Sequence, residues 1–224
     1  MCYNVSRIIW GIGVMDTKIY KMDGNAPDYS AVLNCAEVIK NGGIVALPTE
    51  TVYGLAANAF DVSAVERLYS AKNRPPLKPI SLCVGTLEQA EAVAVFDDRA
   101  RRLFSAFMPG PLTIVLPKRD NVPDIVTAGG DTVGIRVPAN ETVSLLTKLC
   151  GVPLALTSAN LSGEPSPKSG GEVIESLSGR ADAIIDGGLV EIGTESTLIS
   201  LVGEPLMLRE GAIPKETIYR YLDS

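Results

Sequence analysis

The clearest chemical signal is a run of positive charge in residues 71–79, Ala-Lys-Asn-Arg-Pro-Pro-Leu-Lys-Pro, within a chain whose formal net charge is -6. Lys72 falls on the last turn of a predicted helix that Asp61 would cap. Pro75 disfavours helical geometry at Arg74, and an extended backbone would point the Lys72 and Arg74 side chains the same way. The spacing therefore predicts two cations that converge on one anion, with cations that complement a helix end as the alternative.

Two further groups of polar side chains follow predicted buried strands. The strand at 44–47 runs into a turn of hydroxyls and one carboxylate, and the strand at 153–156 runs into a turn that contains Ser158 and Asn160. In an extended chain Ser158 and Asn160 project to the same side, which brings a hydroxyl and an amide together. Because open α/β sheets bind ligands at the carboxyl ends of strands, both turns are candidate sites, although threonines also cap ordinary turns.

A third cation lies inside a predicted strand. In residues 132–138 alternation places Thr132, Gly134 and Arg136 on one face, and the arginine is surrounded by aliphatic residues. A buried arginine needs an anionic partner. That partner is either a carboxylate of the protein itself or a bound ligand, and the residues alone leave both alternatives open.

The composition excludes several kinds of chemistry. The chain contains no histidine, which rules out imidazole bases, Ser-His triads and histidine metal sites. The acidic balance argues against a broad nucleic-acid surface. The cysteines show no paired spacing, so the sequence predicts neither a zinc cluster nor a disulfide framework and favours a reducing cytoplasm. Catalysis would have to rely on lysine, arginine, hydroxyls, carboxylates and the substrate's own groups.

Hydrophobic periodicity predicts an α/β protein. With 224 residues, 46% of them hydrophobic, the chain can bury a sizeable core. Strands that interleave with helices without strict alternation predict a single α/β domain with an open, twisted mixed sheet. The predicted helices are 28–41, 61–72, 99–108, 140–150, 173–177, one opening at Thr86 and one from Pro214, and the predicted strands are 44–47, 80–84, 112–116, 132–138, 153–156, 183–185, 197–201 and one ending near 208.

The N-terminal segment has two interpretations. Residues 8–14 are apolar but too short, and too interrupted by Gly11 and Gly13, for a membrane span. The same glycines fail the dinucleotide fingerprint because position 16 is Asp. Residues 1–24 are therefore either an extension or an edge strand.

Six short motifs are spread along the chain. They are residues 47–55 (Leu-Pro-Thr-Glu-Thr-Val-Tyr-Gly-Leu), 72–75 (Lys-x-Arg-Pro), 109–113 (Pro-Gly-Pro-Leu-Thr), 134–138 (Gly-Ile-Arg-Val-Pro), 157–163 (Thr-Ser-Ala-Asn-Leu-Ser-Gly) and 208–211 (Leu-Arg-Glu-Gly). Taken in order, these motifs resemble the YrdC family of L-threonylcarbamoyladenylate synthases. The match covers about residues 25–215, which the resemblance makes the catalytic domain, with 216–224 as the end of a C-terminal helix. Because the chain ends at Ser224, it resembles the short, single-domain form. The family fold is a twisted open sheet around a large concave, locally positive cavity.

The resemblance implies a nucleotidyltransferase that forms threonylcarbamoyl-AMP and pyrophosphate from L-threonine, bicarbonate or CO2, and ATP. Its product would pass to a tRNA threonylcarbamoyl transferase complex for modification next to the anticodon. Mg²⁺ would enter with ATP, held mainly by phosphate oxygens and water rather than by dedicated metal ligands. The resemblance also implies a cytoplasmic protein without membrane contact, with weak tRNA or double-stranded RNA binding as an accessory property.

The family's functional residues carry over to two sets of positions. The catalytic pairs fall on Lys72, Arg74, Ser158 and Asn160. Residues implied for ATP are Arg74, Lys78, Thr132, Ser158, Ser166 and Arg209, and those implied for L-threonine are Thr51, Cys83, Arg136, Leu156 and Ser196. The sequence departs from the family pattern at Lys78, where asparagine is frequent, and at Cys83, where histidine is frequent. We expect Cys83 to be a buried small hydrophobe rather than a reactive thiol.

Two alternative functions stand beside the synthase. A non-catalytic module that binds double-stranded RNA or tRNA in the basic cavity is disfavoured by the acidic balance and by an aromatic content of 5%. A carbamoyl adenylate enzyme, like the YrdC-like part of hydrogenase-maturation proteins, is disfavoured because those proteins are longer and carry acylphosphatase and zinc-finger segments that this sequence lacks.

Overall fold

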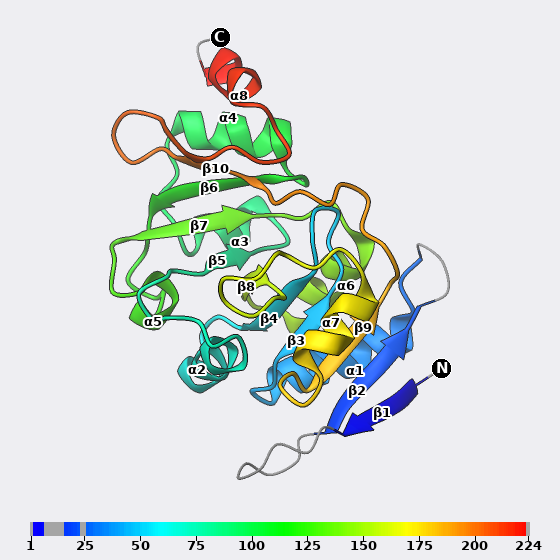
Figure 1. The fold of residues 1–224 in the computed structure, drawn as a ribbon. Coiled ribbons are helices and arrows are strands. Elements are labelled where there is room, and N and C mark those ends of the chain that lie inside the picture. Colours follow the sequence, from blue (N-terminus) through cyan, green and yellow to red (C-terminus); the bar gives the residue numbers. More distant parts are fainter. Residues whose placement is uncertain (1, 7–15, 23–25, 223–224) are drawn as a thin grey trace.

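The computed structural model describes residues 2–6, 16–22 and 26–222 (Figure 1). Within these ranges one sheet has the strand order β1-β2-β9-β3-β4-β8-β5-β7-β6-β10-β11. The strands are β1 (Cys2–Ser6), β2 (Asp16–Lys21), β3 (Val45–Leu47), β4 (Gly54–Asn58), β5 (Ser81–Cys83), β6 (Leu112–Pro117), β7 (Thr132–Arg136), β8 (Leu154–Ser158), β9 (Ala183–Asp186), β10 (Thr197–Ser200) and β11 (Leu206–Arg209). The helices are α1 (Tyr29–Lys40), α2 (Val62–Ala71), α3 (Leu87–Glu91), α4 (Asp98–Phe107), α5 (Asp124–Thr127), α6 (Glu141–Cys150), α7 (Gly170–Leu177) and α8 (Lys215–Leu222).

The sheet is mixed and open, which confirms the predicted fold class. Parallel pairs such as β5 with β7 and β6 with β10 stand beside antiparallel pairs such as β4 with β8. The sheet does not close, because β1 and β11 lie at its two ends. The sequence analysis did not assign β4 or α5, whose short segments carry weak periodicity.

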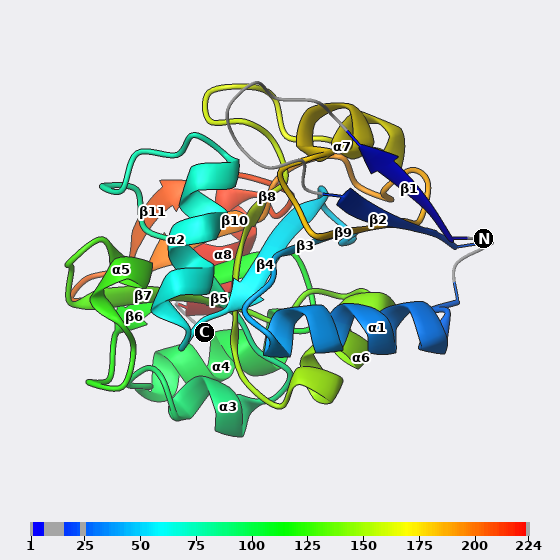
Figure 2. The same cartoon turned by 90° about the horizontal axis from the view of Figure 1, so that it is seen from below.

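Alternation along the central strands produces two hydrophobic cores, one on each face of the sheet. Val45 and Leu47 of β3 pack in the cluster that contains α1 and α6, whereas Ala46 between them belongs to the cluster that contains α2 and α7. Figure 2 shows α1 and α6 together on one side of the sheet and α7 on the other. Burial on both faces explains why these strands are continuously apolar.

Several predicted helix starts are confirmed by their caps. The Asp28 carboxylate accepts hydrogen bonds from the Ser30 and Ala31 amides, and Asp61 accepts from Ala64. Asn140 likewise accepts from Val143. These caps satisfy amide groups that the first helical turn leaves without partners.

The geometry expected between Lys72 and Arg74 is wrong in one respect. Helix α2 ends at Ala71, Lys72 is its C-cap, and Asn73 has a left-handed φ of 50° rather than an extended one. Alternation therefore does not apply. Lys72 turns into the protein, with 1% of its surface exposed, while Arg74 stays half-buried.

The start of the chain contributes the first two strands of the sheet. β1 pairs with β2 antiparallel, and β2 pairs with β9 parallel. The apolar segment 8–14 lies outside the described residues. No helix in the described part of the chain has both the length and the apolar character needed to cross a membrane.

Candidate active site

A cavity of about 270 Å³ lies over β5 and β8, and its described lining includes Arg74, Arg136, Ser158, Glu195 and Arg209. These residues come from five separate stretches of the chain. β7 and β8 run in opposite directions, because β7 is parallel to β5 and β5 is antiparallel to β8. The site is therefore built across the face of the sheet, and not in the strand-end crevice that the sequence analysis assumed.

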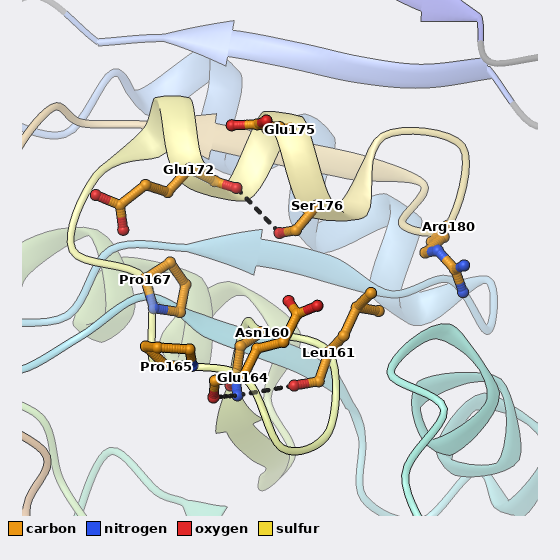
Figure 3. A pocket seen from close by; sticks show the side chains of 9 residues that line it. All are labelled: Asn160, Leu161, Glu164, Pro165, Pro167, Glu172, Glu175, Ser176 and Arg180. Atoms are coloured by element: carbon orange, nitrogen blue, oxygen red, sulfur yellow. Dashed lines mark hydrogen bonds between the residues drawn. The ribbon is translucent and has the colours of Figure 1, made fainter.

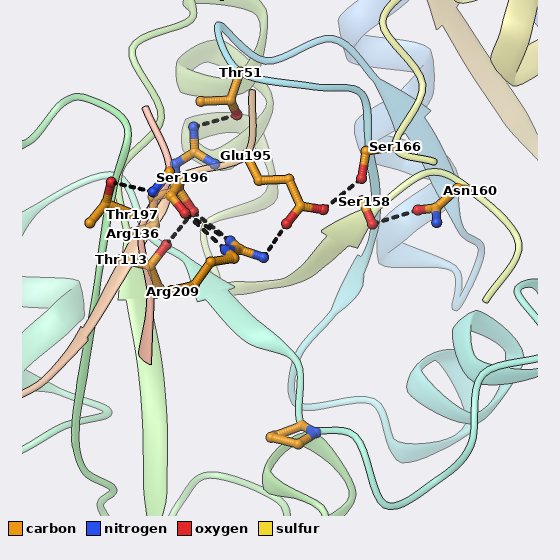
Figure 4. Close-up of polar contacts among 12 residues, drawn as sticks. Thr51, Thr113, Arg136, Ser158, Asn160, Ser166, Glu195, Ser196, Thr197 and Arg209 are labelled. Atoms are coloured by element: carbon orange, nitrogen blue, oxygen red, sulfur yellow. Dashed lines mark hydrogen bonds and ion pairs between the residues drawn. The ribbon is translucent and has the colours of Figure 1, made fainter. Parts of the chain in front are cut away.

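Arg136, the last residue of β7, is held along one edge of its guanidinium. Nε donates to the Gly110 carbonyl at 3.3 Å, and Nη2 donates to Glu50 Oε1 at 2.9 Å. Nη2 also donates to Thr51 Oγ1 at 2.8 Å (Figure 4). Nη1 donates to none of the described residues. It is absent from the buried polar atoms that lack a hydrogen-bond partner, so it is open to solvent or to a ligand. One end of a fixed fork is therefore left for an anion.

The partner of Arg136 is thus a carboxylate of the protein. Glu50 is 4% exposed and Arg136 is 9% exposed, so both charges are withdrawn from water together. Among the described atoms, Glu50 Oε2 is buried and accepts no hydrogen bond. Thr51 Oγ1 lies 2.8 Å from Thr49 Oγ1, and Thr49 Oγ1 donates to the Val52 carbonyl at 2.7 Å. This series of hydrogen bonds orients the Thr51 hydroxyl so that its oxygen accepts from Arg136.

Arg74 is held by main-chain carbonyls instead. Its Nε donates to the Lys78 carbonyl at 3.2 Å and its Nη2 to the Pro79 carbonyl at 2.8 Å. Pro75 and Pro79 keep this loop rigid, since proline fixes its own φ. As with Arg136, Nη1 donates to no described residue, and Arg74 forms no close ion pair within the described part of the chain, although the Tyr69 hydroxyl and the charge of Glu195 both act on it.

Arg209, at the end of β11, is also anchored through Nε and Nη2, but its Nη1 is occupied. Nε and Nη2 donate to the Ser196 carbonyl at 3.1 and 2.9 Å. Nη1 forms an ion pair with Glu195 Oε2, and Ser166 Oγ donates to Glu195 Oε1 at 2.6 Å (Figure 4). Glu195 therefore bridges Arg209 and Ser166.

Ser158, Asn160 and Lys72 form a connected group, as the paired spacing predicted for Ser158 and Asn160. Ser158 Oγ donates to Asn160 Oδ1 at 2.5 Å (Figure 4), and Lys72 Nζ donates to the Ser158 carbonyl and, at 3.3 Å, to Asn160 Oδ1. Burial lowers the pKa of Lys72 to about 7, with Arg74 acting in the same direction and Glu195 opposing it. Lys72 and Asn160 thus fix the end of β8 from behind.

The predicted site residues separate into those on the cavity wall and those away from it. The described lining contains Arg74, Cys83, Arg136, Leu156, Ser158, Ser196 and Arg209. Thr51 is fully buried behind Arg136, and Ser166 approaches through Glu195. Lys78 offers its carbonyl to Arg74, and Thr132 lies at the start of β7, at the opposite end of that strand from Arg136. The roles of these residues toward substrates stay predictions.

Cys83 is a buried wall residue, as expected. It is 1% exposed, and burial raises the pKa of its thiol to about 11. A thiol with a raised pKa is a poor nucleophile at neutral pH. Cys83 therefore contributes shape rather than reactivity.

Two carboxylates of the site, Glu50 and Glu195, received no role from the sequence. Each stands in a polar turn, Glu50 in the turn at 48–53 within the first motif and Glu195 in the turn at 193–196 outside the motifs. The sequence did contain a signal for Glu50, because a buried Arg136 needs an anionic partner and the turn after residues 44–47 contains a carboxylate. The pairing of each carboxylate with its arginine depends on the order of the strands in the sheet. Local sequence patterns do not reveal that order.

A second cavity, of about 750 Å³, lies between the 158–167 turn and α7 (Figure 3). Its lining includes Asn160, Glu164, Glu172 and Arg180. Asn160 Nδ2 donates to carbonyls in this wall, at 2.6 Å for Glu164, so Asn160 separates the two cavities. With more carboxylates than cations, the larger cavity does not suit a polyanion, and the smaller one is the candidate active site.

Comparisons with known proteins place most of this chain in one family. Residues 37–211 match the family model for Sua5, YciO and YrdC, which carries the description telomere recombination. A threonylcarbamoyl-AMP synthase of Pyrococcus abyssi is 46% identical over 84% of this chain and 56% of its own length. One from Bacillus subtilis is 40% identical over 93% of this chain and 59% of its own length.

Solved structures show the same relationship. The P. abyssi Sua5 structure complexed with L-threonine has a TM-score of 0.88 and 43% identity, over 91% of this chain and 60% of that one. This chain thus spans between 56% and 60% of the length of these three proteins. The chain belongs to the Sua5/YciO/YrdC family.

Proposed function

We propose that this chain is an L-threonylcarbamoyladenylate synthase, which forms threonylcarbamoyl-AMP and pyrophosphate from L-threonine, bicarbonate or CO2, and ATP. The observation that carries the proposal is the set of arginines on one cavity wall. Arg136, Arg74 and Arg209 all line this cavity, and each is fixed by its own anchors. A reaction that joins an amino-acid anion to a polyphosphate needs several fixed cations of this kind.

The two ends of the cavity fit different anions. Arg136 is already paired with Glu50, so it offers one end of a fork, which suits a single carboxylate such as that of threonine. Arg74 is anchored by neutral carbonyls and forms no close ion pair with a described residue, which suits phosphates. The cavity of about 270 Å³ lies near the lower end of ligand-site volumes, about 300 Å³, so we expect adenosine to reach its rim.

The chemistry then proceeds without a protein nucleophile. The threonine amine condenses with bicarbonate to give a carbamate and water. A carbamate oxygen attacks the α-phosphorus of ATP, the bond from that phosphorus to the β-bridging oxygen breaks, and pyrophosphate leaves with the electron pair. Fixed guanidinium and hydroxyl donors stabilise the charge that develops on the phosphoryl oxygens.

Mg²⁺ fits this site as a companion of ATP. The described residues contain no group of three or more metal-ligating side chains, and the phosphates offer the hard oxygen ligands that Mg²⁺ prefers. Of the described lining, Glu195 is the carboxylate within reach of such an ion. Bound there, Mg²⁺ would neutralise phosphate charge.

The relatives' names support the synthase and give no support to an RNA-binding module. We propose that the product passes to a tRNA threonylcarbamoyl transferase complex and that the chain acts in the cytoplasm. Weak tRNA or double-stranded RNA binding stays part of this proposal as an accessory property.

Pyrophosphate release by the purified protein tests the function. The assay omits L-threonine, bicarbonate or ATP in turn, and mass spectrometry identifies the adenylate. We expect release to require all three substrates and the product to carry the threonylcarbamoyl group. Release without threonine, or adenylate formation from carbamoyl phosphate instead, contradicts the proposal. A protein that binds tRNA tightly but releases no pyrophosphate supports the RNA-binding alternative.

A further inference from the structure

Apart from its reach toward a Mg²⁺ ion, Glu195 has no role in the proposed reaction, yet it takes donors that ATP should use. Among the described residues that line the smaller cavity it is the only acidic one. Its carboxylate accepts from Ser166 Oγ at 2.6 Å and pairs with Arg209 Nη1 (Figure 4). Both partners are residues that the family resemblance assigns to the nucleotide. One carboxylate therefore occupies two predicted phosphate donors.

The surrounding charges explain why the Glu195 carboxylate lies beside Arg209 and Ser166. Burial lowers the pKa of Lys72 and of Arg74, and the charge of Glu195 opposes that lowering in both cases. Glu195 thus interacts with Lys72 and Arg74 as well as with its direct partner, Arg209. A position that contacts one arginine and one hydroxyl, and that feels the charge of two further cations, attracts any anion, whether a side chain or a phosphate.

Arg209 does not depend on Glu195 for its position. Its Nε and Nη2 donate to the Ser196 carbonyl, and Nη2 also lies 3.2 Å from Ser196 Oγ. Arg74 and Arg136 are anchored by the same edge and leave Nη1 unpaired among the described residues. Arg209 differs because Glu195 takes its Nη1.

The side chain of Glu195 can leave while its backbone stays. The Ala212 amide donates to the Glu195 carbonyl at 2.9 Å, and a Cβ at Gly211 would lie 2.3 Å from that oxygen, so the main chain is tightly packed. The Glu195 side chain is 37% exposed. A rotation about its side-chain bonds is enough to release Arg209 and Ser166.

We propose that Glu195 is an internal competitor for the phosphate groups of the nucleotide. In the ligand-free protein it holds Arg209 Nη1 and Ser166 Oγ, and an incoming phosphate replaces it. The identity of the ligand rests on the proposed function. Before a phosphate can bind, Glu195 must give up its contacts with Arg209 and Ser166. The competition therefore weakens the binding of ATP and, equally, of the pyrophosphate product. Weaker binding of pyrophosphate favours product release.

Titration calorimetry of the Glu195→Gln variant tests the competition. Glutamine keeps the size of the side chain but removes the charge that pairs with Arg209 and repels phosphate. An exposed ion pair contributes up to about 1 kcal/mol, so losing it together with the repulsion should lower Kd for pyrophosphate and ATP about three- to tenfold. Adenosine, which has no phosphate, should bind as it does to the wild type. Glu164→Gln removes a carboxylate from the other cavity and should change none of these values.

The results separate this inference from the proposed function. Tighter binding of both phosphate ligands by Glu195→Gln, repeated in Glu195→Ala, supports the competitor. Unchanged or weaker binding overturns it, and points to Glu195 as a group that helps to hold the nucleotide. If the wild type forms the adenylate but Glu195→Gln gains no affinity, the competitor alone fails. If the wild type binds no ATP, both proposals fail.

Discussion

The two sides of the smaller cavity hold their arginines in different ways. Arg136 lies against Glu50, a carboxylate that is 4% exposed, and against a fully buried threonine hydroxyl. Arg74 and Arg209 are anchored by main-chain carbonyls and remain partly exposed. The first arrangement is a buried ion pair, and the second consists of fixed cations without a buried counter-ion.

The difference follows from what each side must do. A buried pair fixes the position of Arg136 closely, but its loss leaves an uncompensated charge inside the protein. Carbonyl anchors fix Arg74 and Arg209 without neutralising them, so the charge of Arg74 is available to a polyanion, and that of Arg209 becomes available once Glu195 releases it. The Arg136 side therefore belongs both to the fold and to the site, whereas Arg74 belongs almost entirely to the site.

The largest effect should come from Arg136→Ala. Removing the guanidinium leaves the Glu50 carboxylate buried without a charge partner, and we expect the free energy of unfolding to fall by about 3–5 kcal/mol. Chemical denaturation measures this loss. Arg67→Ala is a suitable comparison, because Arg67 pairs with Asp182 at 2.8 Å but the two side chains are 41% and 26% exposed, so a loss of about 1 kcal/mol is expected.

The double variant Glu50→Gln with Arg136→Met separates charge from packing. If the destabilisation comes from the orphaned carboxylate, the double variant should regain most of the lost free energy of unfolding while staying inactive. A double variant as unstable as Arg136→Ala would mean that the pair is not what stabilises this side.

Arg74→Ala should lower activity strongly but change the free energy of unfolding only slightly. Under the proposed function Arg74 is a fixed donor to the transferring phosphoryl group, so its loss should reduce kcat/KM about 100-fold, or about 3 kcal/mol in the transition state. The free energy of unfolding should change by less than about 1 kcal/mol, because the carbonyls of Lys78 and Pro79 remain open to water. Arg102→Ala, on the exposed face of α4, provides the control. A variant that loses as much stability as Arg136→Ala would remove the contrast between the two sides.

Glu50→Gln should give a smaller and more local effect. The amide oxygen can still accept from Arg136 Nη2, but a charge-assisted hydrogen bond becomes a neutral one. We expect the free energy of unfolding to fall by about 1–2 kcal/mol. Pyrophosphate binding, measured by calorimetry, should not change, since the Arg74 and Arg209 anchors do not involve Glu50. A shift in pyrophosphate affinity would show that the two sides are coupled.

The sequence predicted the elements of this site better than their connections. Polar residues that are close in the sequence were paired correctly, as for Ser158 and Asn160, because they are only two positions apart in the chain. Helix starts at Asp28, Asp61 and Asn140 were predicted from local patterns as well, and each of these residues caps its helix. The fold class followed from strands and helices whose apolar patterns are long enough to recognise.

The remaining contacts could not be predicted because they depend on strand order. Arg136 and Glu50 are 86 residues apart, and their pairing requires β7 to reach the turn after β3 in a sheet of mixed direction. The same limit hid the role of Glu195. The one local prediction that failed, at Lys72, failed because Asn73 adopts a left-handed conformation that asparagine tolerates better than most residues.

The smallest effect we predict concerns Lys72, a cation that lies behind the Arg74 side. Its pKa is lowered to about 7, mainly by burial, whereas an unfolded lysine titrates near 10.5. Between these values the unfolded chain binds more protons, so this lysine makes the protein more stable as pH rises from about 7. Denaturation at pH 6 and 8 should show a gain of about 1 kcal/mol that disappears in Lys72→Met. Lys40→Met, which removes an exposed lysine, should keep the gain. The same pH dependence in Lys72→Met would mean that the wild-type lysine stays charged, held by Ser158 and Asn160 as a permanent cation of the Arg74 side.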